Sequence, residues 1–244
     1  MNVEPLARDI LEPAFNRLTA LARLAPDEVD ALRSCASASW RVAAHGEIAG
    51  EQEPVRSPSL ILNGWACRAR IFRDGRRQIL SFLVPGDLIN VTDYPDPLAT
   101  TMVTAVTGVT LCPVPHPVER GSGLAIAYAV SAALQEAYLF RQIARLGRMS
   151  AYERLIDLIA EMHERMLLSG MATPDGLAMP LTQEILADAL GLTSVHLNRT
   201  MQLIRREGIA DVRSGRVTLL NPMGLAQLCD SRPARVSASL PRSI

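Results

Sequence analysis

Polar side chains recur along one side of a short segment near residue 200. At helical spacing from Leu197, apolar residues fall on one side of 193–206, and the other side carries Asn198, Arg199 and Gln202. An arginine can form two hydrogen bonds with guanine, and an asparagine or glutamine can form two with adenine. The segment therefore predicts a helix that reads base edges in DNA.

Two short helices joined by a tight turn would position this reading helix. Thr182 can cap a first helix, Gly191 supplies the turn because glycine adopts positive φ without steric cost, and Thr193 can cap the second helix. Two helices joined in this way form a helix-turn-helix. The buried side of the first helix is expected to hold Ile185, Leu186, Ala189 and Leu190.

A small hairpin is expected after the second helix. Residues 212–217 predict two strands with Arg213 and Arg216 beside the tip, where they could contact DNA phosphates. The distribution of charge also favours DNA binding by this part of the chain. Residues 149–192 hold two arginines and seven carboxylates, whereas residues 193–216, with the reading helix and the hairpin, hold five arginines and two carboxylates. The predicted DNA contacts are Thr182, Gln183, Thr193, Ser194, Val195, His196, Asn198, Arg199, Gln202, Arg205, Arg213 and Arg216.

Composition narrows the remaining functions. The chain has 244 residues, a formal net charge of zero and 25 basic residues, all of them arginine. The lack of lysine excludes a lysine Schiff base and a lysine-dependent phosphate loop. The most apolar run, 124–134, is shorter than the ~20 residues of a membrane span, and no signal peptide is recognised. We therefore expect a cytoplasmic protein of two domains that does not interact with membranes.

The cysteines are expected to be reduced. Cys35, Cys67, Cys112 and Cys229 lie far apart, with no C-x-x-C pair and no zinc spacing. We interpret them as buried thiols in a reducing cytosol and predict no metal site. A redox-sensing thiol is the alternative, because reactivity depends on exposure and pKa.

The hydrophobic period changes between Trp40 and Val114. Short apolar runs there alternate with turn residues, the pattern of a compact β-barrel or roll. The clearest local signal is a hairpin around Asp74-Gly75. The first 34 or so residues predict short helices, the second of them starting at Pro26.

A long helix is expected from about Leu124 to Leu146, where Gly147 interrupts it, and Ser150 can cap the next helix. Apolar residues spread around most of its circumference, so it should pack on its own barrel and on a second subunit. The row assigned to the subunit contact is Leu124, Tyr128, Ser131, Leu134 and Tyr138. A second row contains Ile126, Val130, Ala133, Ala137, Phe140 and Ile143.

The order of these pieces resembles the Crp/Fnr family of bacterial transcription regulators. The resemblance covers nearly the whole chain and rests on Leu62-Asn63-Gly64, the segment 79–89 and the helix-turn-helix over 181–208. It implies an α+β fold with an N-terminal, jelly-roll-like β-roll sensor domain. The implied divisions are the β-roll over 1–118, a dimerisation helix over 119–147, a winged helix-turn-helix over 148–230 and a flexible tail over 231–244.

The resemblance also implies a mode of action. Family members bind two-fold symmetric DNA as homodimers, with half-sites about 34–36 Å apart, and RNA polymerase is a further expected partner. By match to the family motif Arg199 reads a guanine, with Ser194, Val195 and Asn198 at neighbouring positions. Val195 replaces a common glutamate, so the operator is expected to differ. The implied mechanism is a shift between two dimer arrangements, biased by an effector or constitutively competent.

The sensor domain departs from the family's ligand motifs. Asn90-Val91 replaces the Gly-Glu pair that holds ribose, and Thr100-Thr101 replaces the Arg-Ser pair that holds phosphate, so no cyclic AMP binding is expected. Only Cys35 precedes the barrel, which excludes the family's iron–sulfur cluster, and no cofactor is predicted. Arg68 and Arg70, with Thr100 and Thr101, mark a weak candidate for an anion pocket. A solvated hairpin is the alternative.

Other functions stay open at this stage. His45 and His116 could ligate haem, although each is expected to be an ordinary loop histidine. An enzymatic or small-molecule-binding barrel with an accessory helical domain is the alternative function, but no nucleophile–base–acid trio or metal motif supports it. A partner-binding adaptor with a vestigial DNA domain is the third class.

Overall fold

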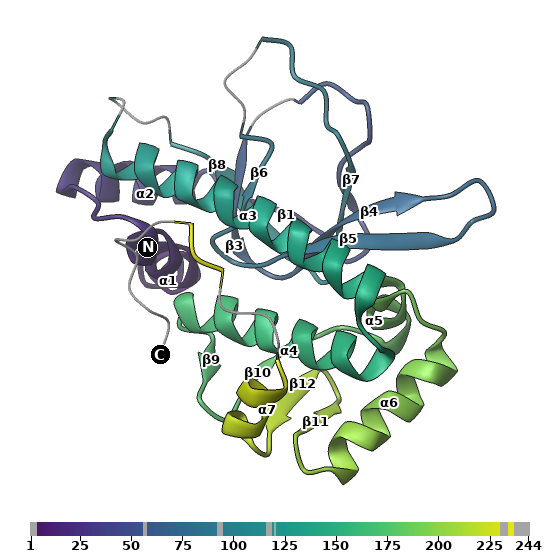
Figure 1. Cartoon of the computed structure of the whole chain (residues 1–244). Coiled ribbons are helices and arrows are strands. Elements are labelled where there is room, and N and C mark those ends of the chain that lie inside the picture. The colour runs from purple at the N-terminus through teal and green to yellow at the C-terminus, as the bar shows by residue number, and fades with distance from the viewer. Residues whose placement is uncertain are drawn as a thin grey trace. The chain divides into compact units, whose positions relative to one another are not determined.

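A computed structural model of the chain describes residues 4–55, 58–91, 95–115, 119, 121–229 and 234–236 (Figure 1). The chain forms two compact units. The first unit contains mainly 1–69 and 82–135, and the second contains mainly 70–81 and 136–234. The predicted tail lies almost wholly outside the described residues.

Two helices precede the strands, as predicted: α1 (Glu4–Leu21) and α2 (Pro26–Ser37). The buried carboxylate of Glu28 accepts hydrogen bonds of 2.8 Å from the backbone N–H groups of Ala25 and Leu124. Burial alone would raise the pKa of Glu28, but these hydrogen bonds lower it below the ordinary value. One side chain thus satisfies donors at the amino ends of two helices, α2 and the long helix α3.

The strands form the predicted β-roll from two four-stranded sheets, with orders β1-β8-β3-β6 and β2-β7-β4-β5. Ile61, Leu83, Val103 and Leu111 belong to one core cluster that draws on strands of both sheets. Antiparallel pairs include β1 with β8 and β4 with β7. The bounds are β1 Trp40–Val42, β2 Glu47–Ala49, β3 Ser59–Asn63, β4 Ala66–Ile71, β5 Arg77–Leu83, β6 Leu88–Ile89, β7 Met102–Ala105 and β8 Val109–Pro113.

A buried ion pair fixes α1 on the β-roll. Arg17 Nη2 lies 2.9 Å from Asp87 Oδ1, and both side chains are fully buried. The second Asp87 oxygen accepts the Val84 N–H at 2.8 Å. Gly86 has φ +90° and lies under the arginine, where an added Cβ would come within 2.5 Å of Arg17 Cδ. Removing either residue would break this buried ion pair, which is strongly destabilising.

The long helix α3 covers Gly123–Arg148, and the prediction that Gly147 interrupts it was wrong. One glycine inside a helix costs only about 1 kcal/mol, which 26 residues of helix can absorb. Ser150 caps α4 (Ala151–Leu168) as predicted, and its hydroxyl accepts the Glu153 N–H at 3.4 Å.

Buried charges join the second half of α3 to α4. Arg145 lies 2.7 Å from Asp157 Oδ2 and 2.6 Å from Glu161 Oε2, and Arg165 lies 3.1 Å from Glu161 Oε1. Arg141 approaches Asp157 through two nitrogens at 2.8 to 3.1 Å. These five side chains, which we call the charge network, are all 8% exposed or less. Asp157 contacts Arg141 and Arg145, and Glu161 contacts Arg145 and Arg165. Each buried carboxylate is therefore paired with two arginines, as the burial of charge requires.

By length and composition, α3 is the one described helix that could cross a membrane. Its second half nevertheless buries Gln142 and Arg145, and its first half buries Tyr128, whose hydroxyl donates to the Pro115 carbonyl at 3.0 Å. Arg145 belongs to the charge network, whose side chains pair with one another as charged groups buried in a protein core do. The buried row of α3 therefore packs within the protein.

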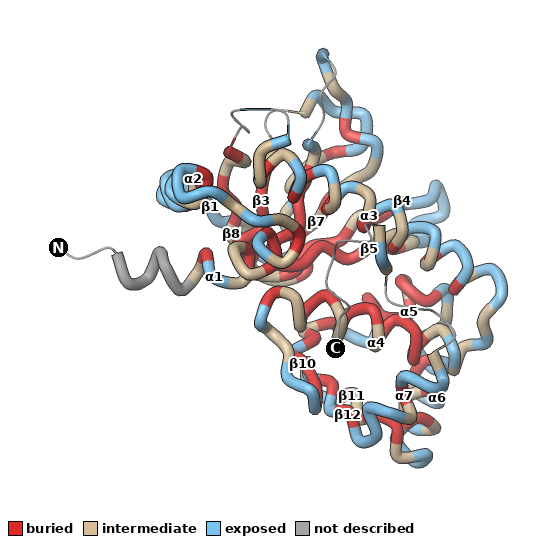
Figure 2. The backbone as a smooth tube through the Cα atoms, turned by 60° about the vertical axis from the view of Figure 1, so that its left-hand side comes forward, coloured by how far each residue is buried: buried red, intermediate tan, exposed pale blue. Residues whose placement is uncertain are grey.

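The second unit completes the predicted winged helix (Figure 1). Its sheet has the order β11-β12-β10-β9, and Figure 2 shows α4 largely buried. The bounds are β9 Ala172–Thr173, β10 Gly176–Ala178, α5 Gln183–Leu190, α6 Ser194–Arg206, β11 Ala210–Arg213, β12 Arg216–Leu219 and α7 Pro222–Leu228.

Side chains from three elements satisfy the last carbonyls of α5. Gln78, Gln142 and Arg154 donate to the carbonyl oxygens of residues 188, 189 and 190, at 2.8, 2.7 and 2.9 Å. Arg154 also donates to the carbonyls of Met149, just after α3, at 2.8 Å and of Leu146, in the last turn of α3, at 3.0 Å. Because the last four carbonyls of a helix have no partner within the helix, these donors stabilise the end of α5.

Arg154→Met should lower the free energy of unfolding by about 2–4 kcal/mol, because three carbonyls lose a charged donor while the apolar stem stays. Urea unfolding of the purified protein would measure this. Arg148→Met is the matched control, since Arg148 is exposed at the end of α3. Equal losses in both variants would contradict the assigned role of Arg154.

Glu164 should make stability depend on pH. Burial raises its pKa to about 7, against the lowering effect of the Arg141 guanidinium. The folded state therefore retains a proton that the unfolded state releases above about pH 4.5, so stability should fall as pH rises from 4.5 to 7. Glu164→Gln should remove this fall and gain on the order of 2 kcal/mol at pH 8, with little change at pH 4.5.

Urea unfolding between pH 4.5 and 8 measures this dependence. Glu153→Gln is the control, because hydrogen bonds from Ser150 lower the pKa of Glu153, which is exposed. The Glu153 variant should keep the fall between pH 4.5 and 7. Parallel curves for wild type and Glu164→Gln would contradict the assignment.

Candidate nucleic-acid interface

The helix-turn-helix is present with the caps that the sequence predicts. The hydroxyls of Thr182 and Thr193 each accept the backbone N–H three residues ahead, at 3.2 Å, at the starts of α5 and α6. Gly191 has φ +63° and ends α5, as expected for a residue that must adopt the left-handed conformation. The predicted helix caps at Thr182 and Thr193 and the predicted glycine turn at Gly191 are therefore confirmed.

The buried and exposed sides of α6 also match the prediction. Leu197, Thr200 and Ile204 are 5% exposed or less and face the second unit's core. Val195 is 64% exposed although it is apolar, which leaves it available for contact with a thymine methyl group. The exposed predicted contacts are Thr182, Gln183, Thr193, Ser194, Val195, His196, Arg199, Gln202, Arg205, Arg213 and Arg216, and Asn198 is half-buried.

Amide groups connect the two helices across the turn. Gln202 Nε2 donates to Asn198 Oδ1 at 2.8 Å, and Asn198 Nδ2 donates to Gln183 Oε1 at 3.4 Å. The Asn198 amide keeps a second N–H and a second lone pair for a ligand. The neighbours therefore orient Asn198 without using its full hydrogen-bonding capacity.

Arg199 differs from Arg205 and Arg213, which both lie near the carboxylate of Asp211. Asp211 lies 3.1 Å from the Arg213 guanidinium and 3.9 Å from that of Arg205, and so connects the end of α6 to the hairpin. Arg199 is exposed and forms no ion pair with any residue that the structure describes. Its five N–H donors are therefore available to a base.

The predicted wing is a two-stranded hairpin. β11 pairs with β12 in antiparallel register, and Arg213 lies opposite Arg216. Ser214 and Gly215 between them have φ of +49° and +73°, the two consecutive positive values of a tight hairpin turn. Like charges opposite each other repel, so this pair favours an anion such as a phosphate nearby.

The row assigned to the subunit contact is buried within this chain, so that assignment was wrong. Tyr128 donates to a backbone carbonyl of its own unit, and the Tyr138 ring lies 4.6 Å from the Arg165 guanidinium carbon. Both rows of α3 are apolar, so periodicity alone did not show which one faces the same chain. The five assigned side chains, all 7% exposed or less, are Leu124, Tyr128, Ser131, Leu134 and Tyr138.

The second row of α3 is more exposed: Ile126, Phe140 and Ile143 are exposed, and Val130, Ala133 and Ala137 are half-buried. The largest exposed apolar side chains on the helix are Ile126 (46% exposed), Leu139 (38%), Phe140 (61%) and Ile143 (67%). Single exposed apolar residues are ordinary, but a row of them along one helix marks an interaction surface.

The weak anion site is not supported. The cavity found in the β-roll does not include Arg68, Arg70, Thr100 or Thr101 among its lining residues. Arg70 and Thr100 are exposed, and Arg68 lies on β4 in register with Val103. The four side chains therefore do not converge on a described pocket.

The histidine and cysteine predictions have mixed outcomes. His45 is exposed in a turn, His116 lies outside the described residues, and the described residues hold no cluster of metal-ligating side chains. Cys67 and Cys112 are buried as predicted, and burial raises the pKa of Cys112 to about 12. Cys35 and Cys229 are half-buried. The Cys229 sulfur lies 3.4 Å from both Arg141 and Asp157, which sequence spacing did not indicate.

Comparison with known proteins agrees with this geometry. Residues 153–228 match the family model of the Crp-like helix-turn-helix domain. The transcriptional activatory protein AadR of Rhodopseudomonas palustris is 26% identical over 178 residues, which cover 70% of this chain and 73% of that protein. The nitrogen fixation regulation protein FixK of Bradyrhizobium diazoefficiens is 28% identical over 169 residues, covering 66% of this chain and 69% of FixK.

A solved structure extends the likeness to the whole fold. FixK2 from Bradyrhizobium japonicum has a TM-score of 0.67 and 24% sequence identity, and the match covers 80% of this chain and 98% of FixK2. The β-roll, the long helix and the winged helix therefore occur together in a known architecture. Residues 153–228, which carry a helix-turn-helix with an exposed, polar reading face, are similar to the Crp-like helix-turn-helix domain, and the relatives and the fold together support a DNA-binding transcription regulator of the Crp/Fnr type.

Proposed function

We propose that the chain binds a two-fold symmetric DNA operator as a homodimer, with α6 of each subunit in the major groove. The observation that carries this proposal is the outer side of α6, where Arg199 is exposed and unpaired among the described residues and Asn198 is oriented by neighbouring amides. These side chains suit guanine and adenine. The opposed pair Arg213 and Arg216 would contact the phosphates beside the same groove.

The exposed row of α3 supports the homodimer. Ile126, Ala133, Phe140 and Gly147 recur every seven residues, and a second series contains Ala129, Glu136 and Ile143. Apart from Glu136, these positions carry small or apolar residues, and apolar residues at a seven-residue repeat are the pattern by which two helices pack along a shared seam. We infer that α3 packs against α3 of a second copy, using the row opposite to the one first assigned.

RNA polymerase is the further partner that we propose. Two relatives are named as a transcriptional activatory protein and a nitrogen fixation regulation protein. A regulator that acts at promoters works in the compartment that holds the DNA, which supports a cytoplasmic location. We propose that this chain likewise acts at promoters, and a two-fold symmetric dimer would present the same surfaces to polymerase on either side of the operator.

Selection of bound sequences from a random DNA pool tests the operator. We expect two inverted half-sites whose centres lie about 34–36 Å apart. Arg199→Ala should cost about 1–3 kcal/mol of binding free energy and relax the preference at one guanine, because a bidentate contact is lost.

Arg216→Ala is the matched control for Arg199→Ala. It should weaken selected and random DNA alike and reduce the salt dependence by about one phosphate contact, because the wing contacts no base. Fluorescence anisotropy at several salt concentrations measures both effects. Equal losses on selected and random DNA with Arg199→Ala would contradict base reading by this residue.

The double substitution Phe140→Glu and Ile143→Glu should dissociate the homodimer at micromolar concentration, because carboxylates would be buried in the helix seam. Light scattering should then give a mass near the 26.5 kDa of one chain. Met223→Glu is the control, because Met223 is 77% exposed on α7, away from that row. A dimeric mass for the double variant would refute the α3 seam.

A further inference from the structure

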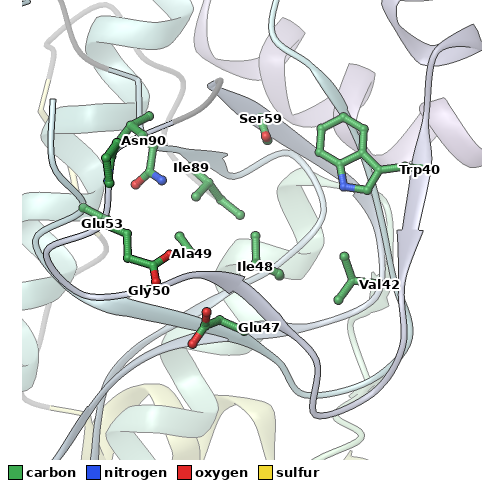
Figure 3. Close-up of a pocket in the computed structure, with 13 residues that line it drawn as sticks. Trp40, Val42, Glu47, Ile48, Ala49, Gly50, Glu53, Ser59, Ile89 and Asn90 are labelled. Carbon is green, nitrogen blue, oxygen red and sulfur yellow. The ribbon is translucent and has the colours of Figure 1, made fainter. Parts of the chain in front are cut away.

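The β-roll contains a cavity of about 400 Å³ that the DNA-binding function does not use. The cavity is lined by Trp40 and Val42 of β1, residues 47–49 of β2, and Gly50 with residues 53–55 of the loop after β2 (Figure 3). Ser59, Ile89, Asn90 and Ala99 complete the lining. Pockets that enclose small organic molecules start at about 300 Å³. The cavity is therefore large enough for an aromatic ring with a short side chain.

Backbone hydrogen bonds hold the loop that forms one wall. The N–H of Gln52 donates to the carbonyl of Ala99 at 2.8 Å, and the N–H of Ala99 donates to the carbonyl of Glu53 at 2.9 Å. The N–H of Val55 donates to the carbonyl of Pro97 at 2.8 Å. This wall is thus formed before any ligand arrives, which reduces the ordering cost of binding.

The charged groups at the cavity are both acidic. Glu47 and Glu53 line it, and neither forms an ion pair with any residue that the structure describes. No arginine or histidine is among the described residues that line the cavity. Among the described residues that line the cavity, these two carboxylates are the charged groups, and carboxylates attract a cation and repel an anion.

Gly50 keeps one of these carboxylates beside the wall. An added Cβ at Gly50 would lie 2.6 Å from the carboxyl carbon of Glu53 and 2.8 Å from its Oε2. The Glu53 side chain therefore folds over a glycine, where any other residue would displace it. Its carboxylate lies near the loop backbone at Gly50, although Glu53 as a whole is exposed.

The remaining walls suit an apolar body. Ile48, Ala49 and Ile89 form apolar surface, and the Trp40 indole, 39% exposed, lies across the cavity from Glu53 and Asn90 in Figure 3. An indole face attracts a cation, most strongly where water is excluded. Asn90 adopts a left-handed conformation, φ +58°, and its amide supplies a further polar group.

We propose that this cavity binds a small organic cation, an aromatic or aliphatic amine, between Trp40 and the carboxylates of Glu47 and Glu53. This site differs in its lining residues and in its charge from the anion pocket considered above. It goes beyond DNA binding and does not depend on it, so it is tested on the protein without DNA. A cationic ligand is the opposite of a cyclic nucleotide in charge.

Three probes of similar size and different charge test the proposal: 2-phenylethylammonium, 2-phenylethanol and 3-phenylpropionate. Isothermal titration calorimetry at low salt should show the cation binding at least about tenfold more tightly than the alcohol, and no measurable binding of the anion. Tryptophan fluorescence gives the location. Trp65 is buried, so a change caused by the cation should disappear in Trp40→Phe.

The double substitution Glu47→Gln and Glu53→Gln should weaken the cation by about fivefold or more and leave the alcohol unchanged. Glu51→Gln is the matched control, because Glu51 is an exposed carboxylate of the same loop that does not line the cavity. Circular dichroism confirms that each variant is folded.

Several results would overturn the proposal. The first is equal binding of the cation and the anion. The second is no binding of the cation below about 10 mM, which corresponds to a binding free energy of about 3 kcal/mol. The third is an equal loss of cation affinity in the double variant and in Glu51→Gln. A fluorescence change that persists in Trp40→Phe would place the ligand elsewhere and would overturn it as well. DNA binding by the same preparations reports separately on the winged helix.

Discussion

The arrangement of the second unit depends on the charge network between α3 and α4. Arg145 contacts both Asp157 and Glu161, and all three side chains are 5% exposed or less. Breaking such a buried set by removing one member costs about 3–5 kcal/mol, because a charge is left without a partner or water. The network therefore permits few arrangements of α4 on α3, which is a stricter constraint than apolar packing alone would impose.

From α4 this constraint continues to the reading helix through directional contacts. Arg154, on the first turn of α4, donates to the end of α5 as well as to the turn after α3. Gly191 then fixes the turn, and Leu197 and Ile204 bury the inner side of α6. Arg199 is therefore an exposed, long side chain on a rigid support. Precise support of this kind is what recognition of a base edge requires.

Local features of the fold could be predicted from the sequence because their causes are local. Thr182, Gly191 and Thr193 cap and end their helices through groups only a few residues away, and the same holds for the wing turn at Ser214-Gly215. The two rows of α3 could not be distinguished in this way. Each row is apolar, and only the folded β-roll and α4 determine that Leu134 is buried whereas Phe140 is exposed.

The partners that polar residues find far away in the sequence could not be predicted from the sequence either. Arg77 on β5 lies 2.7 Å from Asp188 on α5, more than a hundred residues later, and no spacing in the sequence indicates this pair. The cavity of the β-roll is another case, because Trp40 is placed by pairing with Leu111, Glu47 by pairing with Thr104, and the loop of Glu53 by hydrogen bonds to residues 97–99. Pairing across such distances depends on tertiary structure, and no spacing in the sequence encodes it.

The formal net charge of zero conceals two local fields of opposite sign. Residues 193–216 carry a net positive charge, and the cavity in the β-roll is lined by two carboxylates and no described base. A polyanion and a small cation could therefore each find a complementary surface on one neutral chain, and neither surface is visible in the total charge.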